Sequence, residues 1–126
     1  MAEKFFVYVV DDDDGMRASL SDLFRSVGYS VRDFNSAEAF LEAKLEDAHA
    51  CLISDVRLRG ASGLELQRRL MRDGARIPVV LMTGCGDVEM YAEGMKAGAV
   101  RFLEKTAGGQ DILDAVSAAL AAYKAC

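Results

Sequence analysis

Short apolar runs alternate along the chain with segments in which apolar residues recur every three or four positions. The first run, residues 5–10, is continuous, aromatic and β-branched, as expected of a strand buried on both faces. From Met16 to Val27 the apolar residues share one face of a helix, which Gly28 ends. The alternation then continues to the end of the chain.

The whole pattern predicts five strands, each followed by a helix. The strands are predicted at residues 5–10, 29–34, 50–53, 79–82 and 99–103. The helices are predicted from Met16, after the cap Ser36, from Leu64 after a loop at 57–63, at 87–97 and at 110–123. Strands that alternate with helices specify a parallel sheet with helices on both faces, and five units are too few for a barrel. We therefore expect an open, doubly wound α/β fold.

Length and composition bound the class of protein. A chain of 126 residues fits one domain, residues 1–126, and 52% apolar residues suffice for a core. No apolar run is long enough to cross a membrane, and the N-terminus lacks the pattern of a signal peptide. We expect a cytoplasmic protein that does not contact membranes.

The net charge, the spacing of the cysteines and the single histidine exclude further classes of protein and of site. The net charge is −5, without a basic stripe, which argues against direct contact with nucleic acid. The three cysteines show no CxxC spacing, which argues against disulfides and zinc. His49 is the only histidine, so sites with several histidines are excluded. The segment 46–49 is predicted to be a loop, which gives His49 a solvated position.

Polar residues stand where the predicted strands end. They are Asp11, Asp12, Asp13 and Asp14, then Asp55, Thr83 and Lys105. The carboxyl ends of parallel strands meet at one edge of the sheet, where ligands bind in such folds. Crowded carboxylates need a cation, and oxygen ligands favour Mg²⁺ first and Mn²⁺ or Ca²⁺ next. An EF-hand loop does not fit, and Asp13 or Asp14 also suits a helix N-cap.

A metal ion beside a carboxylate, an ammonium and a hydroxyl is suited to phosphoryl transfer. The metal and the ammonium spread the charge of the phosphoryl oxygens, and a carboxylate can act as the nucleophile. Neither a Walker A loop nor a GxGxxG motif is present, so nucleotide binding has no support.

These residues resemble the receiver domain of bacterial two-component response regulators, and the resemblance covers the whole chain. The motifs that carry it are VVDD at 9–12, SDVR at 54–57, GASGLEL at 60–66, LMTG at 81–84 and FLEK at 102–105. The resemblance implies a flavodoxin-like (βα)5 fold with a five-stranded sheet of order 2-1-3-4-5.

The resemblance also implies a metal site and a phosphoacceptor. Asp55 would accept the phosphoryl group. Asp11, Asp12 and Asp55 would hold Mg²⁺, with Mn²⁺ as a substitute and Asp12 favoured over Asp11 as a direct ligand. The backbone carbonyl of Arg57 would be a further ligand.

Four more positions surround that predicted site. Thr83 would bond the phosphoryl oxygen, Lys105 would pair with it, and Phe102 would be the aromatic switch. Thr83 could instead only begin a helix, and Phe102 could be ordinary core. Cys85 would at most tune the access of water to the acyl phosphate.

The segments 83–90 and 95–99 are especially similar to the nitrogen-fixation-type branch of the family. Its members usually carry a LuxR-like helix-turn-helix output domain, which this chain lacks. The implied partners are a sensor histidine kinase or a phosphotransfer protein, and a second copy in a phosphorylation-dependent homodimer.

Two positions depart from the family pattern. Thr106 follows Lys105 where the family usually has proline in a cis peptide, so we predict a trans bond and a rearranged loop. Arg59 replaces a proline that usually stands before Gly60.

Three other functions are compatible with part of the pattern. A degenerate receiver would act as a phosphorylation-independent interaction module. A haloacid-dehalogenase-like phosphohydrolase would use Asp11 and Asp13, but this chain is short for that class. A flavodoxin-like redox protein would share the fold and lack these acids.

Overall fold

A computed structural model gives the fold and describes residues 5–45, 49–58, 62–74, 77–83, 96, 101–104 and 107–122. The strands are β1 (Phe5–Val10), β2 (Ser30–Phe34), β3 (His49–Asp55), β4 (Val79–Thr83) and β5 (Arg101–Glu104). The helices are α1 (Asp14–Ser26), α2 (Ala37–Glu42), α3 (Gly63–Arg72) and α5 (Gly109–Ala122). None of the helices in the described part of the chain is long and apolar enough to span a bilayer.

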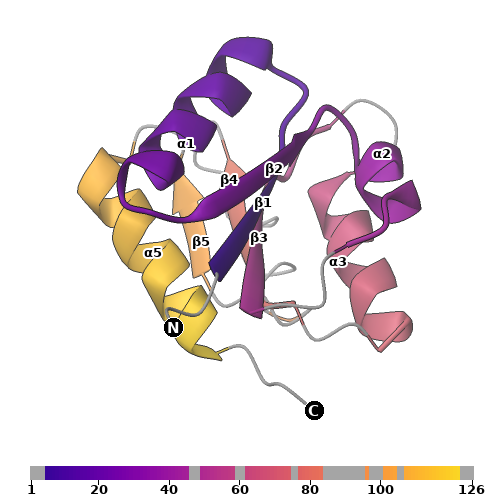
Figure 1. Cartoon of the computed structure of the whole chain (residues 1–126). Helices are drawn as coiled ribbons and strands as arrows, with labels where there is room; N and C mark the ends of the chain where they lie inside the picture. Colours follow the sequence, from indigo (N-terminus) through magenta and orange to yellow (C-terminus); the bar gives the residue numbers. More distant parts are fainter. Residues whose placement is uncertain are drawn as a thin grey trace.

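The five strands form one parallel sheet in the order β2-β1-β3-β4-β5. Helices α1 and α5 cover one face, and α2 and α3 cover the other (Figure 1). This arrangement confirms the predicted doubly wound fold and its strand order. The order reverses direction between β1 and β3, which both lie in the middle of the sheet, and their carboxyl ends are therefore adjacent.

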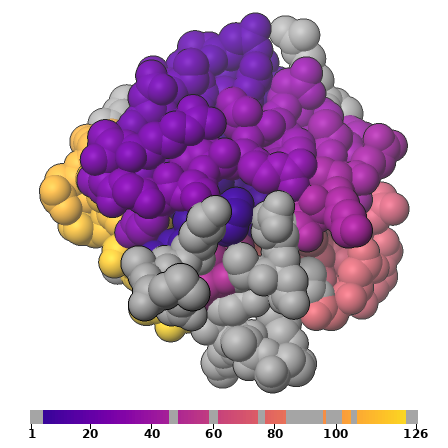
Figure 2. Space-filling view, in the orientation of Figure 1, coloured from indigo at the N-terminus to yellow at the C-terminus, as the bar shows by residue number. Residues whose placement is uncertain are grey.

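Two apolar cores result, one on each face of the sheet. In β1, Val7 and Val9 pack toward α1 and α5, whereas Tyr8 and Val10 pack toward α2 and α3. All four side chains are buried, which explains why the strand is a continuous apolar run. In the space-filling view, the residues that follow β1 in the N-terminal half of the chain form a continuous surface over the upper part of the molecule (Figure 2).

Cys51 lies within the core beside α1 and α5, and burial raises the pKa of its thiol to about 12. The nucleophilic thiolate is therefore nearly absent at pH 8. We expect iodoacetamide to alkylate Cys51 about a thousandfold more slowly in the native protein than in urea. Peptide mapping by mass spectrometry checks this, and equal rates in the two states would contradict the burial.

The boundaries of three elements differ from the prediction in ways that matter for the site. Strand β3 continues to Asp55, and β4 continues to Thr83, so both residues end strands rather than follow them. Helix α1 begins at Asp14, two residues before the apolar stripe that starts at Met16, because the side chain of Asp13, one of the two predicted N-caps, accepts a hydrogen bond from the N–H of Met16.

The predicted loop position of His49 is wrong. His49 is the first residue of β3, where it pairs with Phe5 of β1. Its half-buried ring meets the Phe5 ring edge-on at 4.9 Å between centroids, and Nε2 contacts the carbonyl oxygen of Leu120 near the end of α5. Polar neighbours in sequence suggested a loop, but the continuing pairing with β1 extends the strand to this residue.

The predicted helix at 87–97 lies outside the described residues except for Lys96, which is helical. The described helices otherwise lie close to their predicted positions. Helix α2 has Ser36 as its N-cap, whose hydroxyl accepts a hydrogen bond from Ala39 at 3.0 Å. Helix α5 begins one residue before its predicted start.

Candidate functional site

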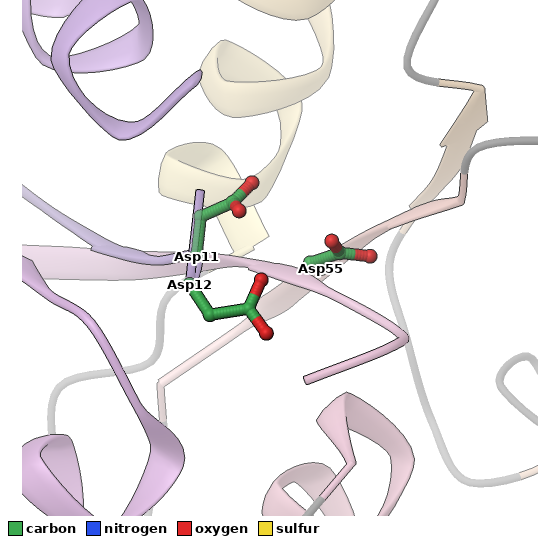
Figure 3. A group of neighbouring side chains, drawn as sticks. All are labelled: Asp11, Asp12 and Asp55. Carbon is green, nitrogen blue, oxygen red and sulfur yellow. The ribbon is translucent and has the colours of Figure 1, made fainter. Parts of the chain in front are cut away.

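Three carboxylates meet at the carboxyl edge of the sheet. Asp11 and Asp12 follow β1, and Asp55 ends β3, the neighbouring strand. Figure 3 shows the three side chains beside one another, and each offers an oxygen within 4.8 Å of the other two. Asp11 and Asp55 are buried, whereas Asp12 is partly exposed. The predicted parallel sheet, in which the carboxyl ends of the strands share one edge, led us to expect this meeting of residues that are distant in sequence.

Backbone N–H groups fix the two buried carboxylates. Oδ1 of Asp11 accepts a hydrogen bond from the N–H of Asp13 at 2.9 Å, and Oδ1 of Asp55 accepts one from the N–H of Arg57 at 3.0 Å. Each bond spans two residues, as in an Asx-turn, so each loop turns around its own carboxylate. The acids are thus held in place by the chain directly after each strand.

The other two acids of the aspartate run serve α1. Asp13 is its N-cap and Asp14 its first residue, as the alternative interpretation of these residues predicted. Negative charge there also interacts favourably with the positive end of the helix dipole. Among the described residues, the carboxylates that group as potential metal ligands are Asp11, Asp12 and Asp55.

Helix α3 begins unusually close to the backbone of Asp55. A Cβ atom placed on Gly63 would lie 2.3 Å from the carbonyl oxygen of Asp55 and 3.0 Å from the Cα atom of Val56. The N–H of Gly63 donates to the carbonyl of Val56 at 2.9 Å, and the N–H of Val56 donates to that of Met82 at 2.8 Å. The segment that carries Asp55 is therefore held in place by backbone hydrogen bonds to α3 on one side and β4 on the other.

Thr83 ends β4 and provides a hydroxyl at the same edge of the sheet. The side chain is buried, and Oγ1 has no hydrogen-bond partner among the described residues. An unpaired buried hydroxyl costs free energy, and natural proteins keep few of them. The preceding residue, Met82, is the register partner of Asp55, which places Thr83 one residue beyond the acid on the adjacent strand.

The remaining predicted site residues are only partly described. Phe102 lies in β5 opposite Leu81, is half-buried and packs against the core beside α2 and α3. Half-burial is compatible both with a switch and with ordinary core. Lys105 and Cys85 lie outside the described residues, as does the bond between Lys105 and Thr106 whose trans geometry we predict.

Sequence reasoning missed Arg17, a half-buried residue of α1. Its guanidinium donates to the carbonyl oxygen of Asp11 at 2.9 Å and to Oδ1 of Asp14 at 2.6 Å, and its Nε lies 3.6 Å from Oδ2 of Asp33. The spacing of Asp14 and Arg17 on one helix face was the available signal. The contact with the Asp11 carbonyl depends on the fold and has no sequence signature.

The donor set fits a hard divalent cation. All the candidate side-chain ligands are carboxylate oxygens, and Mg²⁺ is typically bound by one or two carboxylates with water or phosphate oxygens filling the other positions. Three carboxylates this close repel one another without a cation. The hydroxyl of Thr83, which has no hydrogen-bond partner among the described residues, lies at the same edge of the sheet and suits the oxygen of a further ligand.

Comparisons with known proteins place this chain among known relatives. The family model described as response regulator receiver domain matches residues 7–117. Nodulation protein W of Bradyrhizobium diazoefficiens is 49% identical over 116 residues, which are 92% of this chain and 51% of that protein. Transcriptional regulatory protein FixJ of Azorhizobium caulinodans is 46% identical over 120 residues, 95% of this chain and 57% of that protein. The chain thus spans about half the length of these relatives.

Solved structures of response regulators share the fold of this chain. The crystal structure of FixJ-N superposes with a TM-score of 0.92 at 37% identity and covers 99% of this chain and 100% of its own. The structure of response regulator StyR superposes with a TM-score of 0.88 at 42% identity, covering 95% of this chain and 61% of its own. On the family match, these relatives and the shared fold, this chain belongs to the response regulator receiver domains of two-component signalling systems.

Proposed function

We propose that Asp55 is the phosphoacceptor of this receiver and that Asp11, Asp12 and Asp55 hold Mg²⁺, together with the backbone carbonyl of Arg57. The observation that carries the proposal is the convergence of three carboxylates within 4.8 Å at the carboxyl edge of the sheet. Mn²⁺, another cation that prefers oxygen ligands, would substitute. When bound, the metal supplies positive charge against the phosphoryl oxygens.

The chemistry of this chain is a single displacement at phosphorus. An oxygen of the Asp55 carboxylate forms a bond to phosphorus, and the bond to the leaving group breaks with its electron pair going to that group. The leaving group is the histidine of a sensor kinase or a phosphotransfer protein, or acetate when acetyl phosphate is the donor. The N–H of Arg57 orients Asp55 by its hydrogen bond to Oδ1.

The added phosphoryl charge is sensed by Thr83. Its buried Oγ1 lacks a partner among the described residues and can donate to a phosphoryl oxygen on Asp55. Lys105 pairs with the same group, and movement of Thr83 is relayed to the half-buried ring of Phe102 in β5. The result is a changed protein–protein surface, such as a homodimer of two receivers. Cys85 plays at most a minor part, in the access of water to the acyl phosphate.

We further propose that the receiver acts in the cytoplasm as part of a transcriptional regulator. Its relatives include proteins named transcriptional regulatory proteins, of which it matches about half. The receiver would take its signal from a histidine kinase, and a LuxR-like helix-turn-helix domain would contact the DNA. The receiver itself remains a signalling domain with only self-phosphorylation and self-dephosphorylation chemistry.

The position of Asp13 weighs against a phosphohydrolase. That function would require Asp13 to act beside Asp11, but the Asp13 side chain accepts the N–H of Met16 at 3.1 Å and caps α1. Asp13 is also absent from the group of carboxylates that meet at the sheet edge.

Intact mass spectrometry with acetyl phosphate tests the proposed function. We expect the wild-type protein to gain one phosphoryl group in the presence of Mg²⁺ and none when a chelator removes the metal. Steady hydrolysis of a phosphate monoester would instead favour a phosphohydrolase. Absence of the adduct in a protein that binds Mg²⁺ would favour a phosphorylation-independent interaction module.

A further inference from the structure

Arg17 connects three segments around the acidic loop. It lies in α1, with its side chain 19% exposed, and contacts the Asp11 carbonyl at the end of β1, the Asp14 carboxylate in its own helix and the Asp33 carboxylate in β2. The contact with Asp11 is made to the backbone carbonyl oxygen and not to the carboxylate. Arg17 is therefore linked to the proposed metal site through the backbone of Asp11.

The backbone contact constrains the chain on which Asp11 and Asp12 lie. The carbonyl oxygen that Arg17 binds belongs to the peptide unit joining Asp11 and Asp12, and a peptide unit is planar. The preceding peptide unit is also fixed, because the N–H of Asp11 donates to the carbonyl of Phe34 at 3.1 Å. Both peptide units that flank Asp11 are thus held, and with them the direction of the Asp11 side chain. The peptide unit after Asp12 is held as well, because the N–H of Asp13 donates to Oδ1 of Asp11 at 2.9 Å, so the direction of Asp12 is also constrained.

A guanidinium this close to a cation site has two opposing effects. Its positive charge repels a divalent cation, so charge alone would make Arg17 lower the affinity for Mg²⁺. Its hydrogen bonds hold the loop in one arrangement, which raises the affinity because less ordering remains to be done on binding. The sign of the change when Arg17 is replaced therefore distinguishes the two effects.

We infer that Arg17 is a positioning residue for the proposed metal site and that its fixing of the Asp11–Asp12 peptide outweighs its repulsion of the cation. This inference rests on the proposed function. The guanidinium suits the task because its planar fork of donors reaches a carbonyl and a carboxylate at once, whereas an ammonium is a single point of charge. Arg17 also offsets part of the negative charge of the loop before the metal binds.

Titration with Mg²⁺ alone by isothermal titration calorimetry tests the inference without a phosphodonor. We expect Arg17→Gln to raise the dissociation constant about tenfold, as is typical when a residue that orients metal ligands is lost. Arg17→Lys retains the charge, so a loss of affinity in this variant reports positioning alone. Arg25→Gln, at the exposed end of the same helix, is the matched control for net charge and should bind as the wild type does.

Each outcome decides the inference. Weaker binding by Arg17→Gln and Arg17→Lys, with normal binding by Arg25→Gln, supports it. Equal or tighter binding by Arg17→Gln overturns it and leaves the proposed function intact, whereas absence of Mg²⁺ binding by the wild type overturns both. Circular dichroism without Mg²⁺ verifies folding, and if Arg17→Gln is unfolded the comparison of Arg17→Lys with the wild type decides.

Discussion

Asp55→Asn is expected to take up no phosphoryl group from acetyl phosphate, whereas the wild-type protein takes up one. An amide oxygen is a far weaker nucleophile than a carboxylate, and the substitution also removes one of the three charges that would bind the metal. The fold should persist, because the asparagine oxygen can still accept the N–H of Arg57 that Oδ1 accepts at 3.0 Å. Intact mass and thermal unfolding measure the two properties separately.

Asp13→Asn is the matched control for this loss. It removes a carboxylate from the loop that carries Asp11 and Asp12, yet asparagine caps helices as well as aspartate does, so α1 should be unaffected. The backbone N–H of Asp13 that binds Asp11 is also retained. Phosphorylation of Asp13→Asn at the wild-type level is expected. An adduct of wild-type yield on Asp55→Asn would remove Asp55 from the role of acceptor.

Much of the fold could be predicted because its signals are local or periodic. The doubly buried strands β1 and β4 are continuous apolar runs, and apolar residues recur at helical spacing in α1 and α5. The strand order came from the resemblance rather than from the apolar pattern. His49 was misplaced because its position depends on pairing with Phe5, a contact that the polar sequence before it does not signal.

The features of the site likewise fall into those that the sequence signals and those that depend on how the elements pack. Acids directly after apolar runs are visible in a sequence, and parallel topology brings Asp11, Asp12 and Asp55 together. The contact of Arg17 with the Asp11 carbonyl and the approach of Gly63 to Asp55 depend on how α1 and α3 pack on the sheet. Of these residues, only Gly63 stood out in the sequence, as part of the GASGLEL motif at 60–66. The structure supplies the physical reason for a glycine at this position.

The close approach of Gly63 to the backbone of Asp55 also affects the stability of the fold. Gly63→Ala is expected to destabilise the protein by about 2–3 kcal/mol, because overpacking against atoms that cannot move aside costs this much. The added Cβ atom would lie 2.3 Å from the carbonyl oxygen of Asp55, and the atoms it meets are backbone atoms that hydrogen bonds to α3 and β4 hold in place. Urea denaturation followed by circular dichroism measures the free energy of unfolding.

Helix propensity alone would make Gly63→Ala stabilising, so the expected loss of stability is a stringent test. Alanine is favoured over glycine inside a helix by about 1 kcal/mol, so a loss at Gly63 must arise from the close approach and not from propensity. Gly109→Ala is the matched control: Gly109 also begins a helix, and its added Cβ would meet only the Leu23 side chain at 3.7 Å, an ordinary contact. It should be neutral or slightly stabilising.

Relief of the clash in Gly63→Ala displaces the backbone of Asp55, so phosphorylation by acetyl phosphate should slow in this variant and not in Gly109→Ala. Wild-type stability in Gly63→Ala would show that α3 can shift without cost and would remove the close approach as the reason for glycine.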